Sequence, residues 1–225
     1  MLVFIPRRTD RLHTTVSQLQ KRGFKTLAFP LATVKPTGVK IPAAAAAVLL
    51  TSSAAVPALP ATPLPFYCVG QATAEAAQKA GFRVAYAGTG NGTALAEYVA
   101  QNLSPCPLFH PTTEQAAIDW YHTLQTQGFT IIPAPAYEKS YADHFNDEVV
   151  CCLAENKVSF TLVFSAGAAR HIKTLCQSHH LSEKTLGTVI AISEKAAVPF
   201  RNINHIRVAQ HPNLQEMLNV LEQTT

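Results

Sequence analysis

Residues 2–29, LVFIPRRTDRLHTTVSQLQKRGFKTLAF, contain the pattern that decides the fold. The apolar run at residues 2–5 predicts a strand, and residues 25–29 predict a second one. Between them, apolar residues recur at the spacing of one helix face, namely Leu12, Val16 and Leu19. Asp10 is placed where it can cap that helix. The stretch therefore predicts strand, helix and strand in succession.

The junction that follows this helix, KRGF at residues 21–24, recurs as KAGF at residues 79–82 and as TQGF at residues 126–129. Glycine just past a helix adopts a left-handed conformation at little cost, and the apolar residue after it packs back on the last turn. Each junction precedes a strand-like run. Three such units predict an alternating α/β protein with mainly parallel sheets.

Further strands are predicted, with helices between them, near residues 48–50, 66–69, 83–86, 108–109, 160–164, 188–192 and 206–209. Two proline-flanked pieces, residues 29–36 and 132–137, are predicted to be extended rather than helical. We interpret them as crossings between two lobes. The sequence thus predicts a discontinuous α/β domain of residues 1–35 and 137–225, and an inserted α/β domain of residues 36–136.

The composition excludes disorder, because 48% of the 225 residues are hydrophobic and 14% are charged. The net charge is +4, and no five like charges are consecutive, which argues against a nucleic-acid partner. Residues 36–136 hold three basic and four acidic residues, and the remainder holds fifteen and ten. The positive excess therefore belongs to the discontinuous domain.

No signal peptide is evident, and the longest apolar run, residues 43–50, is far short of the ~20 residues that cross a bilayer. We therefore expect no membrane partner and a cytoplasmic location. The five cysteines lack metal-site or disulfide spacing, and no HxH, HExxH or P-loop motif occurs. We expect no metal and no cofactor. The loop at residues 88–92, GTGNG, is a poor match to a dinucleotide turn, and we expect a flexible loop with Thr93 near a helix start.

Four predicted strands run into turns that open helices, at residues 51–54, 70–74, 165–167 and 193–196. In open parallel sheets such turns lie at the carboxyl edge, where backbone N–H groups and helix dipoles suit anions. Facing one cleft between lobes, they can hold a ligand with several carboxylates or phosphates. The alternative is that four serines only cap their helices, namely Ser52, Ser53, Ser165 and Ser193.

Residues 66–75 (FYCVGQATAE), 79–82 (KAGF), Gly90 and 95–98 (LAEY) together resemble the most distinctive segment of uroporphyrinogen-III synthases. Residues 50–54 resemble the family's first strand-TS turn, and residues 163–167 resemble its counterpart in the second lobe. The connecting strands of the family resemble Pro30-Leu31 and Ala136-Tyr137-Glu138. The resemblance spans nearly the whole chain.

The resemblance implies two α/β lobes, each with a parallel sheet flanked by helices, joined by a two-stranded connector. It implies a lyase that cyclises hydroxymethylbilane, with loss of water and inversion of the terminal pyrrole ring, to uroporphyrinogen III. No cofactor is used. A substrate with eight carboxylates fits the predicted backbone anion sites. We also expect a monomer in transient contact with the upstream deaminase that supplies this substrate.

The resemblance also implies site residues. Tyr137 matches the tyrosine that the family places near the departing hydroxyl, where a phenol can donate a hydrogen bond; the alternative is that it packs between lobes. The substrate-binding candidates are Thr51, Ser52, Gly70, Thr73, Ser165, Ala166, Ser193 and Lys195.

Three segments depart from the family pattern. The first strand has Phe4-Ile5-Pro6 followed by Arg7 and Arg8, where many members have Thr-Arg-Pro. The last turn is Ser193-Glu194-Lys195, in which Lys195 can pair with a carboxylate but Glu194 repels one. His110-Pro111-Thr112 stands where arginine is common. A non-catalytic two-lobed protein that binds anions or tetrapyrroles is therefore the alternative function; a periplasmic-type receptor is disfavoured by the missing signal peptide.

Overall fold

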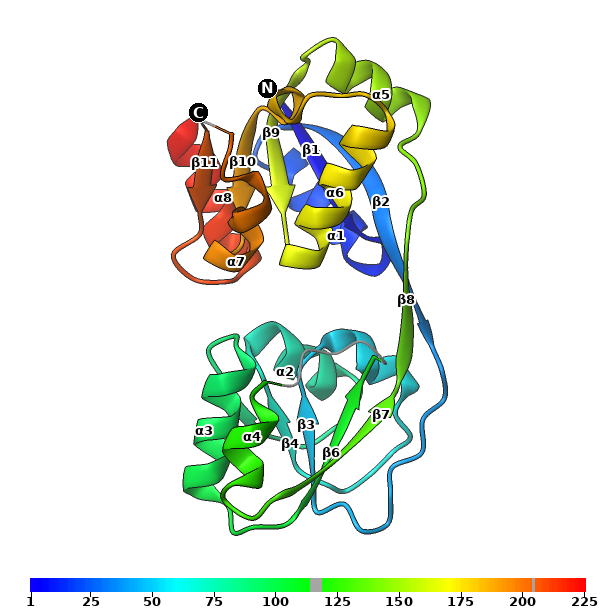
Figure 1. Ribbon diagram of the computed structural model, residues 1–225, viewed down its shortest axis with the longest axis vertical. Coiled ribbons are helices and arrows are strands. Elements are labelled where there is room, and N and C mark those ends of the chain that lie inside the picture. The colour runs from blue at the N-terminus through cyan, green and yellow to red at the C-terminus, as the bar shows by residue number, and fades with distance from the viewer. Residues whose placement is uncertain (114–118, 204) are drawn as a thin grey trace. The chain divides into compact units, whose positions relative to one another are not determined.

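The computed structural model describes residues 1–113, 119–203 and 205–225, in which strands and helices alternate (Figure 1). The strands are β1 Leu2–Arg8, β2 Lys25–Pro36, β3 Ala47–Leu50, β4 Phe66–Cys68, β5 Val84–Ala87, β6 Pro107–Thr112, β7 Thr130–Pro135, β8 Tyr137–Tyr141, β9 Val158–Val163, β10 Thr188–Ala191 and β11 Ile206–Val208. The α-helices are α1 Thr9–Gln20, α2 Gln71–Lys79, α3 Gly92–Asn102, α4 Tyr121–Gln125, α5 Asp147–Ala154, α6 Ala166–Ser178, α7 Glu194–Ala197 and α8 Leu214–Thr224. The 3-10 helices are η1 Ser53–Ala58, η2 Glu183–Leu186 and η3 Val198–Phe200.

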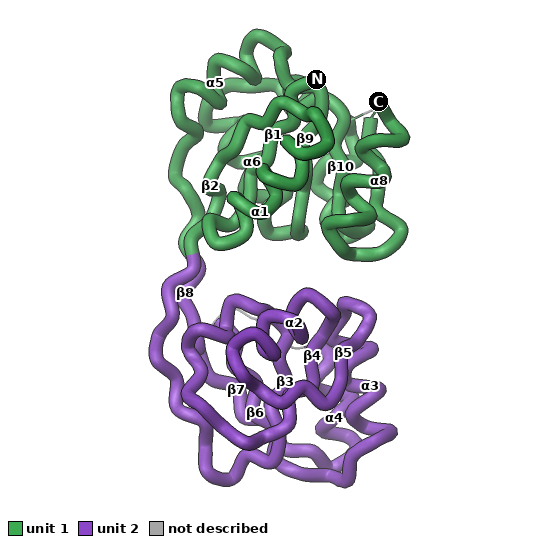
Figure 2. The backbone as a smooth tube through the Cα atoms, turned by 180° about the vertical axis from the view of Figure 1, so that it is seen from behind, with its two compact units in different colours: residues 1–33, 140–225 green, residues 34–139 purple. Residues whose placement is uncertain are grey.

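The chain divides into two compact units, which Figure 2 distinguishes by colour. Unit 1 comprises residues 1–33 and 140–225, and unit 2 comprises residues 34–139. β2 and β8 each cross a boundary between the units, and the two strands are hydrogen-bonded neighbours. The boundaries expected from the sequence, after residues 35 and 136, lie two and three residues from these positions.

Unit 1 is built on a six-stranded sheet in the order β11-β10-β9-β1-β2-β8. The pairs from β11 to β2 are all parallel. In the central strand β1, Phe4 faces one core with helices α5, α6 and α7, whereas Val3 and Ile5 face another with α1 and α8. Both faces of the sheet are therefore covered, as parallel sheets require.

Unit 2 is built on a five-stranded, all-parallel sheet in the order β5-β4-β3-β6-β7. In β3, Val48 and Leu50 pack toward η1 and α2, whereas Ala47 and Leu49 pack toward α3 and α4. The predicted α/β class with mainly parallel sheets flanked by helices is confirmed.

The three glycine-phenylalanine junctions end helices as the sequence predicts. Gly23, Gly81 and Gly128 have φ between 81° and 86°. In each junction the amide of the following phenylalanine donates a hydrogen bond to a carbonyl five residues earlier, at Leu19, Ala77 and Leu124. Helices α5 and α6 end in the same turn without glycine: Asn156 and His180 take its place at φ 54° and 55°.

Two local predictions need correction. α1 begins at Thr9 and its N-cap is Arg8, so Asp10 lies in the first turn and does not cap the helix. The Asp10 carboxylate instead accepts two hydrogen bonds from the Arg8 guanidinium, at 2.5 and 2.7 Å. The strand predicted at residues 25–29 also continues to Pro36, because the proline-flanked piece extends the same strand.

We expect His180→Gly to raise the free energy of unfolding by about 0.5–1 kcal/mol, because a left-handed conformation is costly for a residue with a Cβ. His180 is exposed, so its side chain contributes little packing. Urea unfolding monitored by circular dichroism measures the change. Asn156→Gly is the matched control, with a smaller expected gain because asparagine tolerates this conformation better. A loss of stability in the His180 variant contradicts the interpretation.

Candidate functional site

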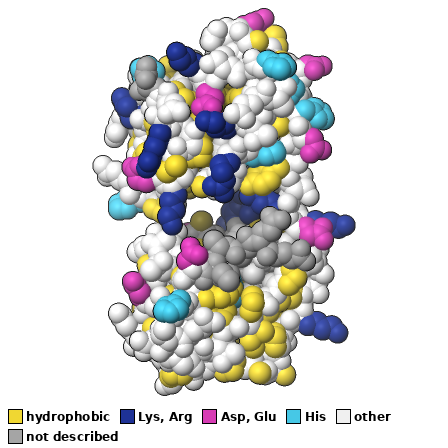
Figure 3. Space-filling view, in the orientation of Figure 1, with side chains coloured by type: hydrophobic (Ala, Val, Ile, Leu, Met, Phe, Trp, Pro, Cys, Tyr) yellow, Lys and Arg dark blue, Asp and Glu magenta, His cyan; other side chains and the backbone are white. Residues whose placement is uncertain are grey.

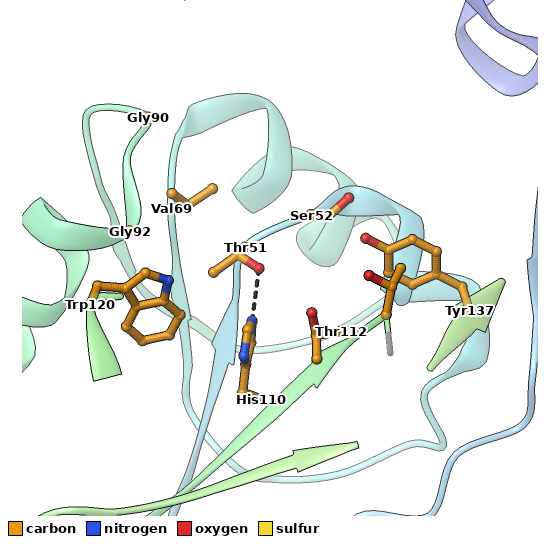
Figure 4. Close-up of a pocket in the computed structure, with 10 residues that line it drawn as sticks. Thr51, Ser52, Val69, Gly90, Gly92, His110, Thr112, Trp120 and Tyr137 are labelled. Atoms are coloured by element: carbon orange, nitrogen blue, oxygen red, sulfur yellow. Dashed lines mark hydrogen bonds between the residues drawn. The ribbon is translucent and has the colours of Figure 1, made fainter. Parts of the chain in front are cut away.

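The order of strands in unit 2 defines where its ligand site is expected. From β3 the chain adds β4 and β5 on one side, and then β6 and β7 on the other. Ligands of open parallel sheets bind beside the carboxyl ends of strands where the order reverses, here between β3 and β6. A pocket of about 340 Å³ lies at this place (Figure 4). It is lined by Thr51, Ser52, Val69, Gly90, Gly92, His110, Thr112, Thr113, Trp120 and Tyr137.

His110 lines this pocket and is hydrogen-bonded to two neighbouring side chains. β6 buries its imidazole to 1% exposure, with Nε2 2.8 Å from Thr51 Oγ1 and Nδ1 hydrogen-bonded to the Tyr121 hydroxyl. The Trp120 ring packs edge-on against the imidazole, with the centroids 5.1 Å apart. Burial lowers the pKa of His110 to about 4 and raises the pKa of Tyr121 to about 12. Both side chains are therefore neutral at neutral pH.

The glycine loop at residues 88–92 packs closely against its neighbours. Gly90 lines the pocket with φ 112°, and its Cα is 3.3 Å from where a Cβ on Gly70 would lie. A Cβ on Gly92 would lie 2.6 Å from the Trp120 ring. Asn91 caps α3 by accepting a hydrogen bond from the Ala94 amide, which places Thr93 near the helix start as predicted. The glycines thus permit close packing beside the pocket.

The structure brings three of the predicted site residues together in this pocket: Thr51, Ser52 and Tyr137. Gly70 is the N-cap of α2, beside the pocket-lining Gly90. Thr73 lies in the first turn of α2 with 8% exposure and does not line the pocket. The other candidates belong to unit 1, at the N-termini of two helices, namely Ser165, Ala166, Ser193 and Lys195.

Capping of helices by serine is confirmed for three of the four serines. The hydroxyl oxygens of Ser52, Ser165 and Ser193 accept hydrogen bonds from the amides of Ala54, Ala168 and Ala196, at 3.2, 3.1 and 3.4 Å. Ser53 is the first residue of η1 rather than its cap. A capping oxygen accepts through a lone pair, so each of the three hydroxyl protons can still be donated to a ligand.

Tyr137 is half-buried at the start of β8, where its ring packs on the core of unit 2. Figure 4 shows its hydroxyl pointing into the pocket. Among the residues that the structure describes, this hydroxyl has no hydrogen-bond partner. It is therefore available to a ligand oxygen.

Arg7 lies at the carboxyl end of β1 in unit 1, next to β9, where the strand order of that sheet reverses. Its guanidinium donates a hydrogen bond to Thr15 Oγ1 and lies 3.9 Å from the centroid of the Phe164 ring. Burial, and then the nearby Arg11 and Arg8, lower the pKa of Arg7 to about 10. The group is still charged at neutral pH, at the edge where a carboxylate ligand is expected.

Three residues that line the pocket are not among the site residues predicted from the sequence, namely His110, Thr112 and Trp120. His110 and Thr112 belong to a segment that departs from the family pattern. A buried histidine inside an apolar strand and the single tryptophan of the chain are the signals that could have drawn attention to them. Within the described residues there is no group of three His, Cys, Asp or Glu side chains suited to a metal ion. No described helix is long and apolar enough to cross a membrane.

The fold and the site define a protein of two parallel α/β units with a ligand pocket at the carboxyl edge of a sheet. The chain belongs to the uroporphyrinogen-III synthase family, whose model, described as uroporphyrinogen-III synthase HemD, matches residues 13–219. Members of this family are lyases that act on a tetrapyrrole substrate in haem biosynthesis.

Solved structures agree in fold. Uroporphyrinogen-III synthetase from Helicobacter pylori 26695 is 18% identical, with a TM-score of 0.68 over 100% of this chain and 99% of that one. A mutant uroporphyrinogen III synthase from the extremely thermophilic bacterium Thermus thermophilus is 14% identical, with a TM-score of 0.57 over 99% and 98% of the two chains. A search of curated proteins by sequence gave no match.

Proposed function

We propose that this chain cyclises hydroxymethylbilane to uroporphyrinogen III, and that the pocket of unit 2 binds part of that substrate. The observation that carries the proposal is the pocket itself, which combines the Thr51 and Ser52 turn with the inward-pointing Tyr137 hydroxyl at the expected edge of the sheet. At about 340 Å³ it is at the small end of ligand pockets, so it accommodates a portion of a four-ring substrate.

Tyr137 assists the departure of the substrate's hydroxyl group. The carbon–oxygen bond breaks with its electron pair on oxygen, and the oxygen leaves as water after taking up a proton. A phenol held near that oxygen donates a hydrogen bond to the developing negative charge. The methylene cation that remains is attacked by a pyrrole carbon, so the protein chiefly has to fold the chain of rings into the geometry that selects inversion.

Neutral donors bind the substrate's carboxylates in unit 2. The described residues that line the pocket include no charged side chain, whereas several hydroxyl groups and the indole of Trp120 face it. The Lys and Arg side chains visible in Figure 3 lie mostly over unit 1, which carries the net positive charge of the chain. This charge attracts the polyanionic substrate over longer distances, and Arg7 supplies a direct partner at the edge of unit 1.

A coupled assay with the deaminase that makes hydroxymethylbilane tests the proposal. Hydroxymethylbilane left alone closes to the type I isomer, so addition of this chain should shift the product to type III. Only type I product in the presence of active deaminase contradicts the proposal. Binding of the tetrapyrrole without turnover would instead support the non-catalytic alternative, which the Glu194 carboxylate in the first turn of α7 favours. Sedimentation of this chain tests the expected monomer. Sedimentation of its mixture with the deaminase tests the expected transient contact.

We expect Tyr137→Phe to lower kcat by about 10- to 100-fold, because the substitution removes the donor but keeps the ring that packs on the core. The rate of type III formation measures the effect. Tyr98→Phe is the control, since Tyr98 stacks on Tyr86 with centroids 3.4 Å apart and does not line the pocket. A Tyr137 variant within twofold of the parent rate excludes the role proposed for the phenol.

A further inference from the structure

Three side chains of unit 2 form a continuous hydrogen-bonded chain that ends in the pocket. It runs from the Tyr121 hydroxyl to Nδ1 of His110, and from Nε2 of His110 to Oγ1 of Thr51. Tyr121 and His110 have exposures of 7% and 1%, whereas Thr51 is half-buried and lines the pocket. Trp120 packs edge-on against both Tyr121 and His110 and so shields them from water.

The direction of the hydrogen bonds follows from the Tyr121 end. A buried phenol needs an acceptor for its proton, and His110 Nδ1 is the partner that the described part of the chain offers. The phenol therefore donates and Nδ1 accepts. A neutral imidazole that accepts at Nδ1 has its proton on Nε2, because one ring nitrogen is a donor and the other an acceptor. Burial keeps the imidazole neutral by holding the pKa of His110 at about 4.

The same direction passes on to Thr51. His110 Nε2–H donates to Thr51 Oγ1 at 2.8 Å, which occupies a lone pair of that hydroxyl. Among the residues that the structure describes, the Thr51 hydroxyl has no other hydrogen-bond partner. Its own proton is therefore directed to the open side, and Figure 4 shows that this side is the pocket. With the opposite direction, Thr51 would present a lone pair there and would repel an anion.

We propose that Tyr121 and His110 are positioning residues that hold the Thr51 hydroxyl as a hydrogen-bond donor to a substrate carboxylate. The identity of the ligand as a tetrapyrrole carboxylate rests on the proposed function. The direction of the hydrogen bonds from Tyr121 through His110 to Thr51 does not. A hydrogen bond from a neutral donor to a buried carboxylate is strong and needs no positive charge in the pocket. The imidazole thus contributes by orienting a hydroxyl group and does not itself contact the substrate.

Kinetics of Thr51 and His110 variants test the energetic coupling. We expect Thr51→Val to raise KM by about 10- to 100-fold, as for loss of a hydrogen bond to a charged group, with kcat changed less. The matched control, Thr51→Ser, keeps the hydroxyl and should stay within about threefold. His110→Met should raise KM by about 5- to 10-fold in the parent and have no further effect in the Thr51→Val background. Additive effects of the two substitutions contradict the proposal.

The protonation of His110 gives a test that does not depend on activity. In the ¹⁵N-labelled parent protein we expect a protonated Nε2 and an unprotonated, hydrogen-bond-accepting Nδ1, with His110→Gln used to assign the signals. A proton on Nδ1 overturns the proposal even if the chain is an active synthase. A proton on Nε2 in a chain that makes no type III isomer leaves the hydrogen-bonded chain in place and refutes the proposed function. This test remains decisive if one of the kinetic variants, Thr51→Val or His110→Met, fails to fold.

Discussion

Replacing Gly187 by alanine is expected to lower the free energy of unfolding of unit 1 by about 3–5 kcal/mol. Gly187 precedes β10 with φ 64° and ψ −146°, a conformation that residues with a Cβ rarely adopt. A Cβ there would lie 2.4 Å from the Ser159 carbonyl oxygen and 2.7 Å from that of Val158. These are backbone atoms of β9, so the start of β10 would have to separate from its neighbour.

Gly23→Ala is the matched control for this substitution. Gly23 is in unit 1 with φ 81°, but a Cβ there would meet no atom within 4 Å, so only the conformational cost of about 1 kcal/mol applies. Circular dichroism follows both units during urea unfolding, whereas fluorescence of Trp120, the single tryptophan, follows unit 2. Equal losses for the two variants would show that the backbone contact is unimportant.

The expected loss at Gly187 also bears on the two turns of unit 1 that are proposed to bind substrate. β9 and β10 pair in parallel, and they end directly before the turns at Ser165 and Ser193. The spacing between these two helix N-termini depends on that pairing. If these turns bind substrate as proposed, a substitution that separates the strands should weaken that binding, even though Gly187 lies at the opposite end of β10.

The parts of the fold that could be predicted from the sequence depend on local chemistry. The turns at Gly23, Gly81 and Gly128 were predictable because glycine is the residue that adopts positive φ most easily. The equivalent turns at Asn156 and His180 were not, because neither residue type marks a positive φ: asparagine tolerates it better than most residues, and histidine adopts it at a cost. Asp10 was assigned to the cap because the sequence does not show that Arg8 binds its carboxylate.

The candidate site divides in the same way. Thr51 and Ser52 were predictable because they follow a buried strand, and Tyr137 because its surroundings resemble a known family. His110 and Trp120 were not, since their position depends on β6 lying beside β3 and on packing against Gly92, both set by the tertiary fold. Thr73 was selected because the family resemblance implies it, yet its side chain is 8% exposed in the first turn of α2.

The low fraction of charged residues in the sequence is reflected in the pocket of unit 2, whose described lining has no charged side chain. A pocket for a carboxylate substrate would ordinarily contain arginine or lysine, but the lining of this one has a neutral histidine at its base. A charged group at this depth would lose most of its hydration, a cost that a neutral hydroxyl donor avoids. Oriented neutral donors inside the pocket can thus bind carboxylates directly, while the positive charge elsewhere on the chain attracts the substrate over longer distances.

Acidification from pH 6.5 to pH 4 is expected to reduce the stability of unit 2 by about 3 kcal/mol through His110 alone. The ordinary pKa of histidine is about 6.5, and burial lowers that of His110 to about 4 in the folded protein. Between these values the unfolded chain binds a proton that the folded chain does not. The stabilisation associated with the neutral imidazole of His110 is therefore complete above pH 6.5. It declines as the pH falls and is lost below about pH 4.

Trp120 makes this titration observable, because its ring lies 5.1 Å from that of His110 and a protonated imidazole quenches indole fluorescence. We expect quenching with a midpoint near pH 4 in the parent and none in His110→Gln, whose amide can replace the imidazole hydrogen bonds. Both proteins contain the same carboxylates, so the titration of these groups cancels when the unfolding free energies of parent and variant are subtracted. This difference should change by about 3 kcal/mol between pH 6.5 and pH 4.

A quenching midpoint near pH 6.5 would mean that the imidazole is hydrated and charged in mildly acidic solution. The neutral chain from Tyr121 to Thr51 would then not persist below that pH, and type III formation should decline with the same midpoint.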